Sequence, residues 1–188
     1  AQTRGLGLRD NVRLFRNCPA VCLPSLYAAC DVFVAPTDSP SESFGLTVVE
    51  AMACARPVIA SDWDGYNELI VHGETGFKVR TYWADCLDEF DGLAPMLAWQ
   101  HQHLHVGQSV SVDIGRLARY LTVLLRNPHL ARRMGDRGRA RAQSLYAWEA
   151  VIRQWEALWL ELHATAATIE RRPEDRMDYL QPNYFEHF

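Results

Sequence analysis

The chain has 188 residues, of which 48% are hydrophobic and 22% are charged, and its formal net charge is -4. This composition is that of a globular domain long enough to bury one sizeable core or two small ones. The negative net charge argues against a nucleic-acid-binding protein, which needs basic side chains to neutralise phosphates. No apolar run approaches the roughly 20 residues of a membrane helix. We therefore expect a cytoplasmic protein, with peripheral attachment to the inner face of a membrane left open.

The first 80 residues alternate strand and helix patterns. In chain order we expect a strand at 11–15, a helix at 23–30, a strand at 31–36, a helix at about 46–55 and a strand at 57–61. A short helical segment at 66–70 and a glycine-containing turn then lead to a strand ending near Val79. The strands at 31–36 and 57–61 are apolar on both faces, as in a parallel sheet covered by helices on both sides. The pattern predicts an α/β fold with part of a Rossmann-like parallel sheet.

The 32 residues of 81–112 form a connector much longer than the roughly 2 to 6 residues usual between elements of α/β domains. It contains aromatic residues and three alternating histidines, His101, His103 and His105. On a strand these histidines would share one face and suit a metal ion, but an exposed polar stretch explains them better because no carboxylate or cysteine partner accompanies them. We expect the aromatic residues to form a small satellite core or a protein contact.

From Ile114 onward the pattern is helical. Asn127 and Pro128 indicate the start of a second helix, and a third begins at Trp148. The apolar residues of the first and third helices recur at helical spacing: Ile114, Leu117, Leu121, Leu124 and Leu125, then Val151, Trp155, Leu158 and Leu162. We predict a partial Rossmann-like domain at 1–80, an insertion at 81–112, helices at 113–165 that complete the same domain, and an extension at 166–188.

Two carboxylates, Glu42 and Glu50, flank the start of the helix that follows the strand at 31–36, with Gly45 between them. Ligands of open α/β sheets bind where a loop leaves the carboxyl end of a strand and enters a helix, because backbone N–H groups and the helix dipole converge there. A glycine lets a phosphate approach the backbone closely, and carboxylates accept hydrogen bonds from hydroxyl groups. A sugar phosphate fits this pattern. Acids near a helix N-terminus are also stabilising by themselves, and Ser43 is a possible helix cap.

The sequence PTDSPSESFGLTVVEAMACARPVIASDWDGYNELIVHGETGFKV, residues 36–79, resembles the donor-binding core of the family-four retaining glycosyltransferases, which have the GT-B fold. The family's E-x7-E motif is matched by Glu42 and Glu50, with FGL inside it. The resemblance extends from about Asn11 to Val79 and continues more weakly through the helices at 117–162.

The resemblance implies a nucleoside-diphosphate sugar as donor, no metal and no further cofactor. Glu50 would accept hydrogen bonds from the ribose hydroxyls. Glu42, the implied catalytic residue, would hold hydroxyls of the transferred sugar. The amides around Gly45 and Leu46 would bind the diphosphate. The implied substrate-binding residues are Ser43, Phe44, Gly45, Leu46, Thr47 and Glu50. The acceptor would be a glycan, a lipid or a small molecule, as in polysaccharide biosynthesis, and the base (UDP, GDP or ADP) is left open.

The sequence also departs from the family. Ala55 and Asp64 stand where the family usually has glycine, and no match to its basic pair that clamps the diphosphate is present. The resemblance implies a longer natural protein with an N-terminal acceptor domain, so that the chain alone would be inactive and would self-associate through an exposed sheet edge or through 81–112. Two alternatives stay open: a non-catalytic nucleotide-sugar-binding or assembly subunit, and a sugar-nucleotide epimerase.

Overall fold

The computed structural model describes residues 7–8, 11–37, 39, 42–85, 92 and 94–168. The chain divides into two compact units, Ala1–Tyr146 and Ala147–Phe188, and each is described by itself. The first unit contains the sheet and all the candidate site residues.

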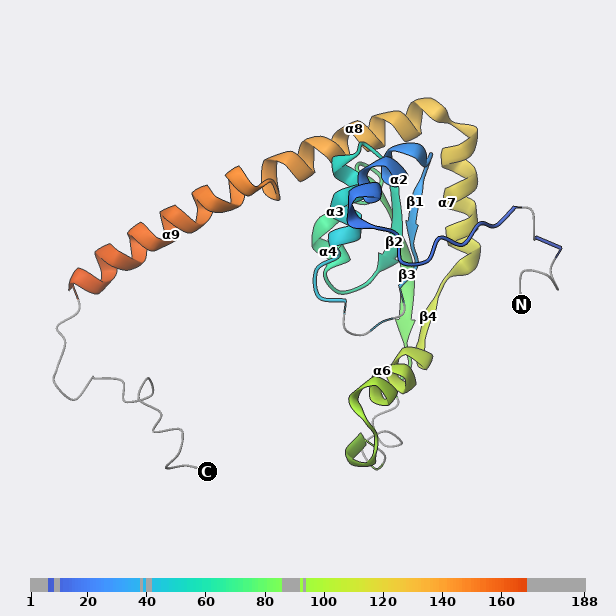
Figure 1. The fold of residues 1–188 in the computed structure, drawn as a ribbon, viewed down its shortest axis with the longest axis horizontal. Coiled ribbons are helices and arrows are strands. Elements are labelled where there is room, and N and C mark those ends of the chain that lie inside the picture. Colours follow the sequence, from blue (N-terminus) through green and yellow to red (C-terminus); the bar gives the residue numbers. More distant parts are fainter. Residues whose placement is uncertain are drawn as a thin grey trace. The chain divides into compact units, whose positions relative to one another are not determined.

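The first unit is built on a four-stranded sheet in the order β1-β2-β3-β4 (Figure 1). Its strands are β1 Phe33–Ala35, β2 Val58–Asp62, β3 Gly76–Trp83 and β4 Val110–Val112. The first three are parallel, with Ala35 opposite Ala60 and Asp62 opposite Arg80. Strand β4 is antiparallel to the last three residues of β3. The carboxyl ends of β1, β2 and β3 therefore meet at one edge of the sheet.

Helices cover both faces of the sheet. They are α2 Leu23–Ala29, α3 Leu46–Ala53, α4 Tyr66–Leu69, α7 Ile114–Arg126 and α8 Pro128–Leu145, and the 3-10 helix η1 Ala20–Cys22 precedes α2. On one face, Val58 and Ala60 of β2 belong to a buried cluster with residues of α3, α4 and α8. On the other face, Ile59 is buried with Leu124 of α7 and Met134 of α8. The alternation along β2 explains why Val58, Ile59 and Ala60 are consecutive apolar residues.

The architecture confirms the predicted fold class: an α/β domain with a Rossmann-like parallel sheet, flanking helices and a helical C-terminal region. The predicted strand at 11–15 is wrong. These residues are irregular, and Leu14 is 76% exposed. No described strand lies beside them, and an apolar run without a partner strand cannot form a ladder.

Helix α8 approaches α3 closely at two glycines. A Cβ atom on Gly135 would collide with the carbonyl oxygen of Ala55, and one on Gly138 would lie 3.4 Å from the side chain of Met52. At the start of α8, the side chain of Asn127 accepts a hydrogen bond from the N–H of Leu130 at 3.1 Å, so the predicted cap is confirmed. The close contact fixes α8 across the end of α3.

We call the described residues of 82–112 (82–85, 92 and 94–112) the arm, because they extend from the carboxyl edge of the sheet (Figure 1). The arm contains the ends of β3 and β4, the 3-10 helix η2 Ala94–Met96 and helix α6 Trp99–Gln108. Its large side chains are mostly exposed: Tyr82, Trp83, Met96, Trp99 and Leu104. The three histidines lie on α6, so the hypothesis that they share one face of a strand is wrong.

The second unit contains helix α9, Trp148–Thr168, which begins at the predicted residue and runs three residues past the predicted boundary at 165. The predicted apolar stripe lies on this helix, where Trp155 and Trp159 have ring centroids 6.0 Å apart. The predicted extension lies outside the described residues from position 169 onward. In the described part of the chain, no helix combines the length and the hydrophobicity that a membrane span requires.

Candidate functional site

The centre of the site is the junction between the loop after β1 and helix α3. Gly45 is the N-cap of α3 and has a φ of +97°, a conformation that favours glycine. Gly45 is buried, and a Cβ atom on it would collide with the ring of Tyr66. No side chain caps the helix, so the structure does not support Ser43 as the cap. Glycine is required here for both conformation and space.

The backbone N–H groups of Gly45, Leu46 and Thr47 lie at the N-terminus of α3. The first bonds of the helix are those of Val48 and Val49 to the carbonyl oxygen of Gly45, at 2.9 and 3.3 Å. Among the described residues, no hydrogen-bond acceptor is found for the three preceding N–H groups. Such groups at the N-terminus of a helix favour an anion through their hydrogen bonds and the helix dipole.

Each carboxylate of the E-x7-E motif accepts a hydrogen bond from a tyrosine. The hydroxyl of Tyr66, from α4, donates to Oε2 of Glu42 at 3.2 Å. The hydroxyl of Tyr27, from α2, donates to Oε2 of Glu50 at 2.8 Å. Two different helices thus orient the two carboxylates, and within the described residues the second oxygen, Oε1, of each has no bonding partner.

The two phenol groups remain hydrogen-bond donors over a wide pH range. Burial and the neighbouring Glu42 carboxylate raise the pKa of Tyr66 to about 12. Burial and the hydrogen bond to Glu50 raise the pKa of Tyr27 above its usual value. Both tyrosines are therefore neutral near pH 7 and keep the proton that each donates to its carboxylate.

The loop after β2 packs directly against the loop that carries the motif. A Cβ atom on Gly65 would lie 2.5 Å from the carbonyl oxygen of Ser43 and 2.6 Å from Cα of Phe44. Asp62, at the end of β2, forms an ion pair with Lys78 at 3.1 Å and does not cap α4, whose N-cap is Gly65. A glycine at position 65 lets the two loops meet backbone to backbone.

Helix α8 holds α4, and through it Tyr66, in place. The guanidinium of Arg141 donates to the carbonyl oxygens of Leu69 at 2.9 Å and Glu68 at 2.7 Å, at the end of α4. Arg141 is partly buried and bridges two helices. It satisfies carbonyl groups that a short helix leaves unpaired.

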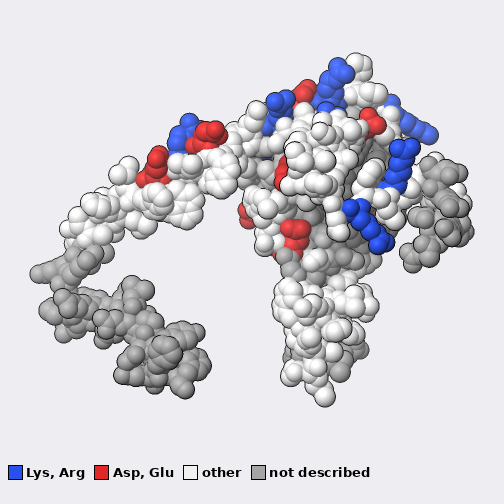
Figure 2. All heavy atoms as spheres, in the orientation of Figure 1, with Lys and Arg blue, Asp and Glu red and all other residues white. Residues whose placement is uncertain are grey.

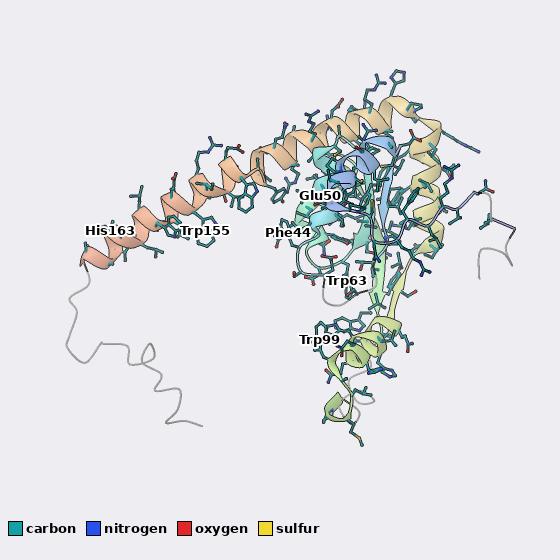
Figure 3. All side chains as sticks on the ribbon, viewed as in Figure 1. Phe44, Glu50, Trp63, Trp99, Trp155 and His163 are labelled. Atoms are coloured by element: carbon teal, nitrogen blue, oxygen red, sulfur yellow. The ribbon has the colours of Figure 1, made fainter. Side chains whose placement is uncertain are left out.

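The structure brings all the predicted site residues together around the N-terminus of α3. Gly45 is buried, Glu42 is partly buried, and Ser43, Phe44, Leu46, Thr47 and Glu50 are exposed. Phe44 lies against Tyr146, with ring centroids 5.6 Å apart. Figure 3 shows Phe44, Glu50 and Trp63 on the first unit. Sequence reasoning missed Tyr27, Tyr66 and Arg141.

The two positions where the family usually has glycine have strained backbones. Ala55 has a φ of +56° and Asp64 a φ of +38°. Ala55 follows α3, and its N–H bonds to the carbonyl oxygen of Met52 at 2.8 Å, as in a left-handed helix end. The expected strain at Ala55 is therefore present, while α3 and its motif are intact.

No group of three or more His, Cys, Asp or Glu side chains is arranged to hold a metal ion within the described ranges. On α6 the three histidines are two residues apart, which on a helix directs neighbours to nearly opposite sides. His103 instead lies against Trp99, with ring centroids 4.1 Å apart.

Comparison with known proteins matches residues 1–91 to the family of glycosyl transferases group 1. The D-inositol 3-phosphate glycosyltransferase of Thermobispora bispora is 35% identical over 133 residues, which are 66% of the chain and 30% of that protein. The structure of sucrose-phosphate synthase from Thermosynechococcus elongatus has a TM-score of 0.59 at 29% identity, over 87% of the chain and 33% of that protein.

A further solved structure, Anabaena HepE in complex with UDP-glucose, has a TM-score of 0.58 at 24% identity, over 85% of the chain and 35% of HepE, and shows the fold alone. The chain spans about a third of the length of these relatives. The family match includes the complete E-x7-E motif, and the sheet and helices around it have the fold of these enzymes. Residues 1–91 therefore match the group 1 glycosyl transferases, the family that the motif predicted.

Proposed function

We propose that the chain is the donor-binding part of a glycosyltransferase and that the site at the N-terminus of α3 binds a nucleoside-diphosphate sugar. One observation carries this proposal: two carboxylates, oriented by Tyr27 and Tyr66, flank a helix N-terminus with a glycine cap. In the proposed complex the N–H groups of Gly45, Leu46 and Thr47 bind the diphosphate. Glu50 accepts hydrogen bonds from the ribose, and Glu42 from the sugar.

The proposed reaction is transfer with retention of configuration. The bond between the anomeric carbon and the phosphate oxygen breaks, and its electron pair stays on the phosphate. The oxygen of an acceptor hydroxyl bonds to the same face of that carbon, and its proton goes to the departing phosphate. Negative charge develops on the diphosphate, so the N–H groups and the dipole of α3 would stabilise the transition state more than the ground state.

The donor is proposed at the level of a nucleotide sugar. Support comes from the D-inositol 3-phosphate glycosyltransferase of Thermobispora bispora, whose name describes a sugar transferase. Which nucleobase and which sugar the donor carries must be determined by experiment. We also propose that the acceptor-binding part is supplied by further sequence and that the 188 residues alone do not catalyse transfer, because the chain spans about a third of its relatives.

The direct test is calorimetric titration of the chain with UDP, GDP and ADP and with their glucose and mannose conjugates, beside the variant Glu50→Gln. We expect selective binding of one nucleotide sugar. Loss of the carboxylate should weaken this binding about tenfold or more, because hydrogen bonds to a charged group are lost. Titration of Glu42→Gln with the free nucleotide and with the nucleotide sugar then separates the two acids. The substitution Glu42→Gln should weaken binding of the nucleotide sugar but not of the free nucleotide, since Glu42 is proposed to contact the sugar.

Glu68→Gln is the matched control, because Glu68 is an exposed acid on α4 whose side chain has no described partner. Equal weakening by Glu68→Gln and Glu50→Gln would attribute the effect to net charge and contradict the proposed role of Glu50. Absence of nucleotide binding by the unmodified chain would contradict the donor site. Conversion of the free donor sugar without an acceptor would favour the epimerase alternative.

A further inference from the structure

Two tryptophans meet at the carboxyl edge of the sheet, beside the proposed donor site. Trp63 directly follows β2, and Trp83 is the last residue of β3, where the arm begins. Their ring centroids are 5.5 Å apart with an interplanar angle of 66°, an edge-to-face pair. Trp83 is 55% exposed and Trp63 is partly buried. The pair is thus partly open to solvent.

Both indole N–H groups are already bonded, which fixes the orientation of the rings. Nε1 of Trp83 donates to Oγ of Ser109 at 2.8 Å, and that hydroxyl donates to the carbonyl oxygen of Val106 at 2.7 Å. Nε1 of Trp63 donates to the carbonyl oxygen of Ser39 at 3.0 Å. Because the polar edges are occupied, the exposed surface of the pair offers aromatic faces and no unpaired N–H donor.

The pair is continuous with the site described above. Trp63 bonds to Ser39 in the loop after β1 that leads to Glu42, and Gly65, two residues after Trp63, touches the backbone of Ser43 and Phe44. In Figure 3, Trp63 lies between the α3–α4 region and the arm that carries Trp99. A ligand on the tryptophans would therefore lie next to a sugar held by Glu42.

The chemistry of residues 92–112, the C-terminal part of the arm, points to an uncharged ligand. In the face shown in Figure 2, the white surface of the lower projection carries no blue or red side chains. The acids of this region, Asp85, Asp88, Glu89 and Asp91, precede residue 92, and 92–112 contains no Asp, Glu, Lys or Arg. Its polar groups are the amides, imidazoles and hydroxyls of Gln, His and Ser. Aromatic faces with neutral hydrogen-bonding groups suit a ring with one apolar C–H face and hydroxyl groups at its rim.

We infer that the Trp63–Trp83 pair is an acceptor subsite, which binds the C–H face of a pyranose or cyclitol ring beside the donor. This inference rests on the proposed function, since an acceptor is needed only if the neighbouring site transfers a sugar. The arm would then provide an acceptor surface on the donor domain itself. Trp83 is the main contact because it is the more exposed of the two rings.

The test is saturation-transfer-difference NMR on the 188-residue chain with UDP present, using methyl β-D-glucopyranoside and myo-inositol as separate probes. We expect transfer to the C–H protons of at least one probe, reduced about fivefold or more in Trp83→Ala through loss of the apolar contact. Trp83→Phe keeps an aromatic face and should retain most of the signal. Calorimetry with the nucleotide sugar should give an affinity within about twofold of the unmodified chain for both variants.

Trp99→Ala is the matched control, because Trp99 is 66% exposed on the same arm and lies against His103 instead of the pair. Equal loss in Trp99→Ala and Trp83→Ala, or no transfer to either probe while the nucleotide sugar binds, would overturn the subsite and leave the proposed donor site standing. Self-association that Trp83→Ala abolishes, without probe binding, would overturn it in favour of a contact between copies of the chain. Failure of nucleotide-sugar binding would remove the proposed function and this inference with it.

Discussion

The sheet with its covering helices and the arm use apolar residues in opposite ways. In the sheet, Val58 and Ile59 are fully buried on opposite faces, each in its own cluster. In the arm, Met96 is 82% exposed and Trp99 is 66% exposed, and α6 has no buried residue. Burial stabilises the fold roughly in proportion to the apolar area removed from water. The sheet and its helices therefore carry the stability of the first unit, while the arm presents exposed apolar surface.

Replacement of a methionine by alanine should change the free energy of unfolding far more in the sheet and its helices than in the arm. Met52 of α3 is fully buried, so Met52→Ala should lower the free energy of unfolding by about 3 kcal/mol through lost contacts and a residual cavity. Met96→Ala in the arm should change it by less than about 0.5 kcal/mol. Urea unfolding of both variants measures this difference. A loss for Met96→Ala comparable to that for Met52→Ala would show that the arm belongs to the stabilising core.

The sequence predicted the sheet and its helices well for a physical reason. In β2 the consecutive apolar residues Val58, Ile59 and Ala60 are buried on both faces of the sheet, and helices such as 114–126 repeat apolar residues at helical spacing. The arm has no such pattern, and helix α6 was not predicted from its sequence. The strand predicted at 11–15 failed because its apolar residues have no partner strand among the described residues. Local pattern is informative where burial enforces it.

Relief of backbone strain should have a smaller effect on stability than the loss of a buried side chain. The two regions also differ in where such strain lies. Among the described residues, the non-glycine residues with positive φ are Asn17, Ala55 and Asp64, and none lies in the arm. Ala55→Gly should stabilise the first unit by about 0.5 to 1 kcal/mol, because relief of the left-handed strain exceeds the entropy lost by glycine on folding. Thermal unfolding measures the gain.

Ala53→Gly, in the last turn of α3, is the control for that substitution. This variant introduces glycine at a helical position and should destabilise the first unit by up to about 1 kcal/mol. If Ala55→Gly were as destabilising as Ala53→Gly, the conformation at position 55 would not store strain. The prediction would then be wrong.

The site was predicted only in part. The motif placed Glu42, Gly45 and Glu50 at the start of a helix, and all three lie there. The tyrosines that orient the acids come from positions 23 and 24 residues away in sequence, and no spacing rule connects them. The available signal was chemical: Tyr27 belongs to an otherwise apolar helix face, and a partly buried phenol requires a hydrogen-bond partner.

The last expected difference between the two regions is in how stability depends on pH, and it appears only in alkali. Tyr66 is buried and its pKa is raised to about 12, so its contribution to stability is fully present below the unfolded value near 10. As the pH rises from about 10 to 12, the unfolded chain loses this proton and the folded chain does not, so stability falls. Tyr66→Phe has no phenol to ionise, and its melting temperature should fall less steeply over this range. Tyr82→Phe, at an exposed position in the arm, is the control. An equally shallow profile for both variants would mean that the buried contact with Glu42 does not couple to folding.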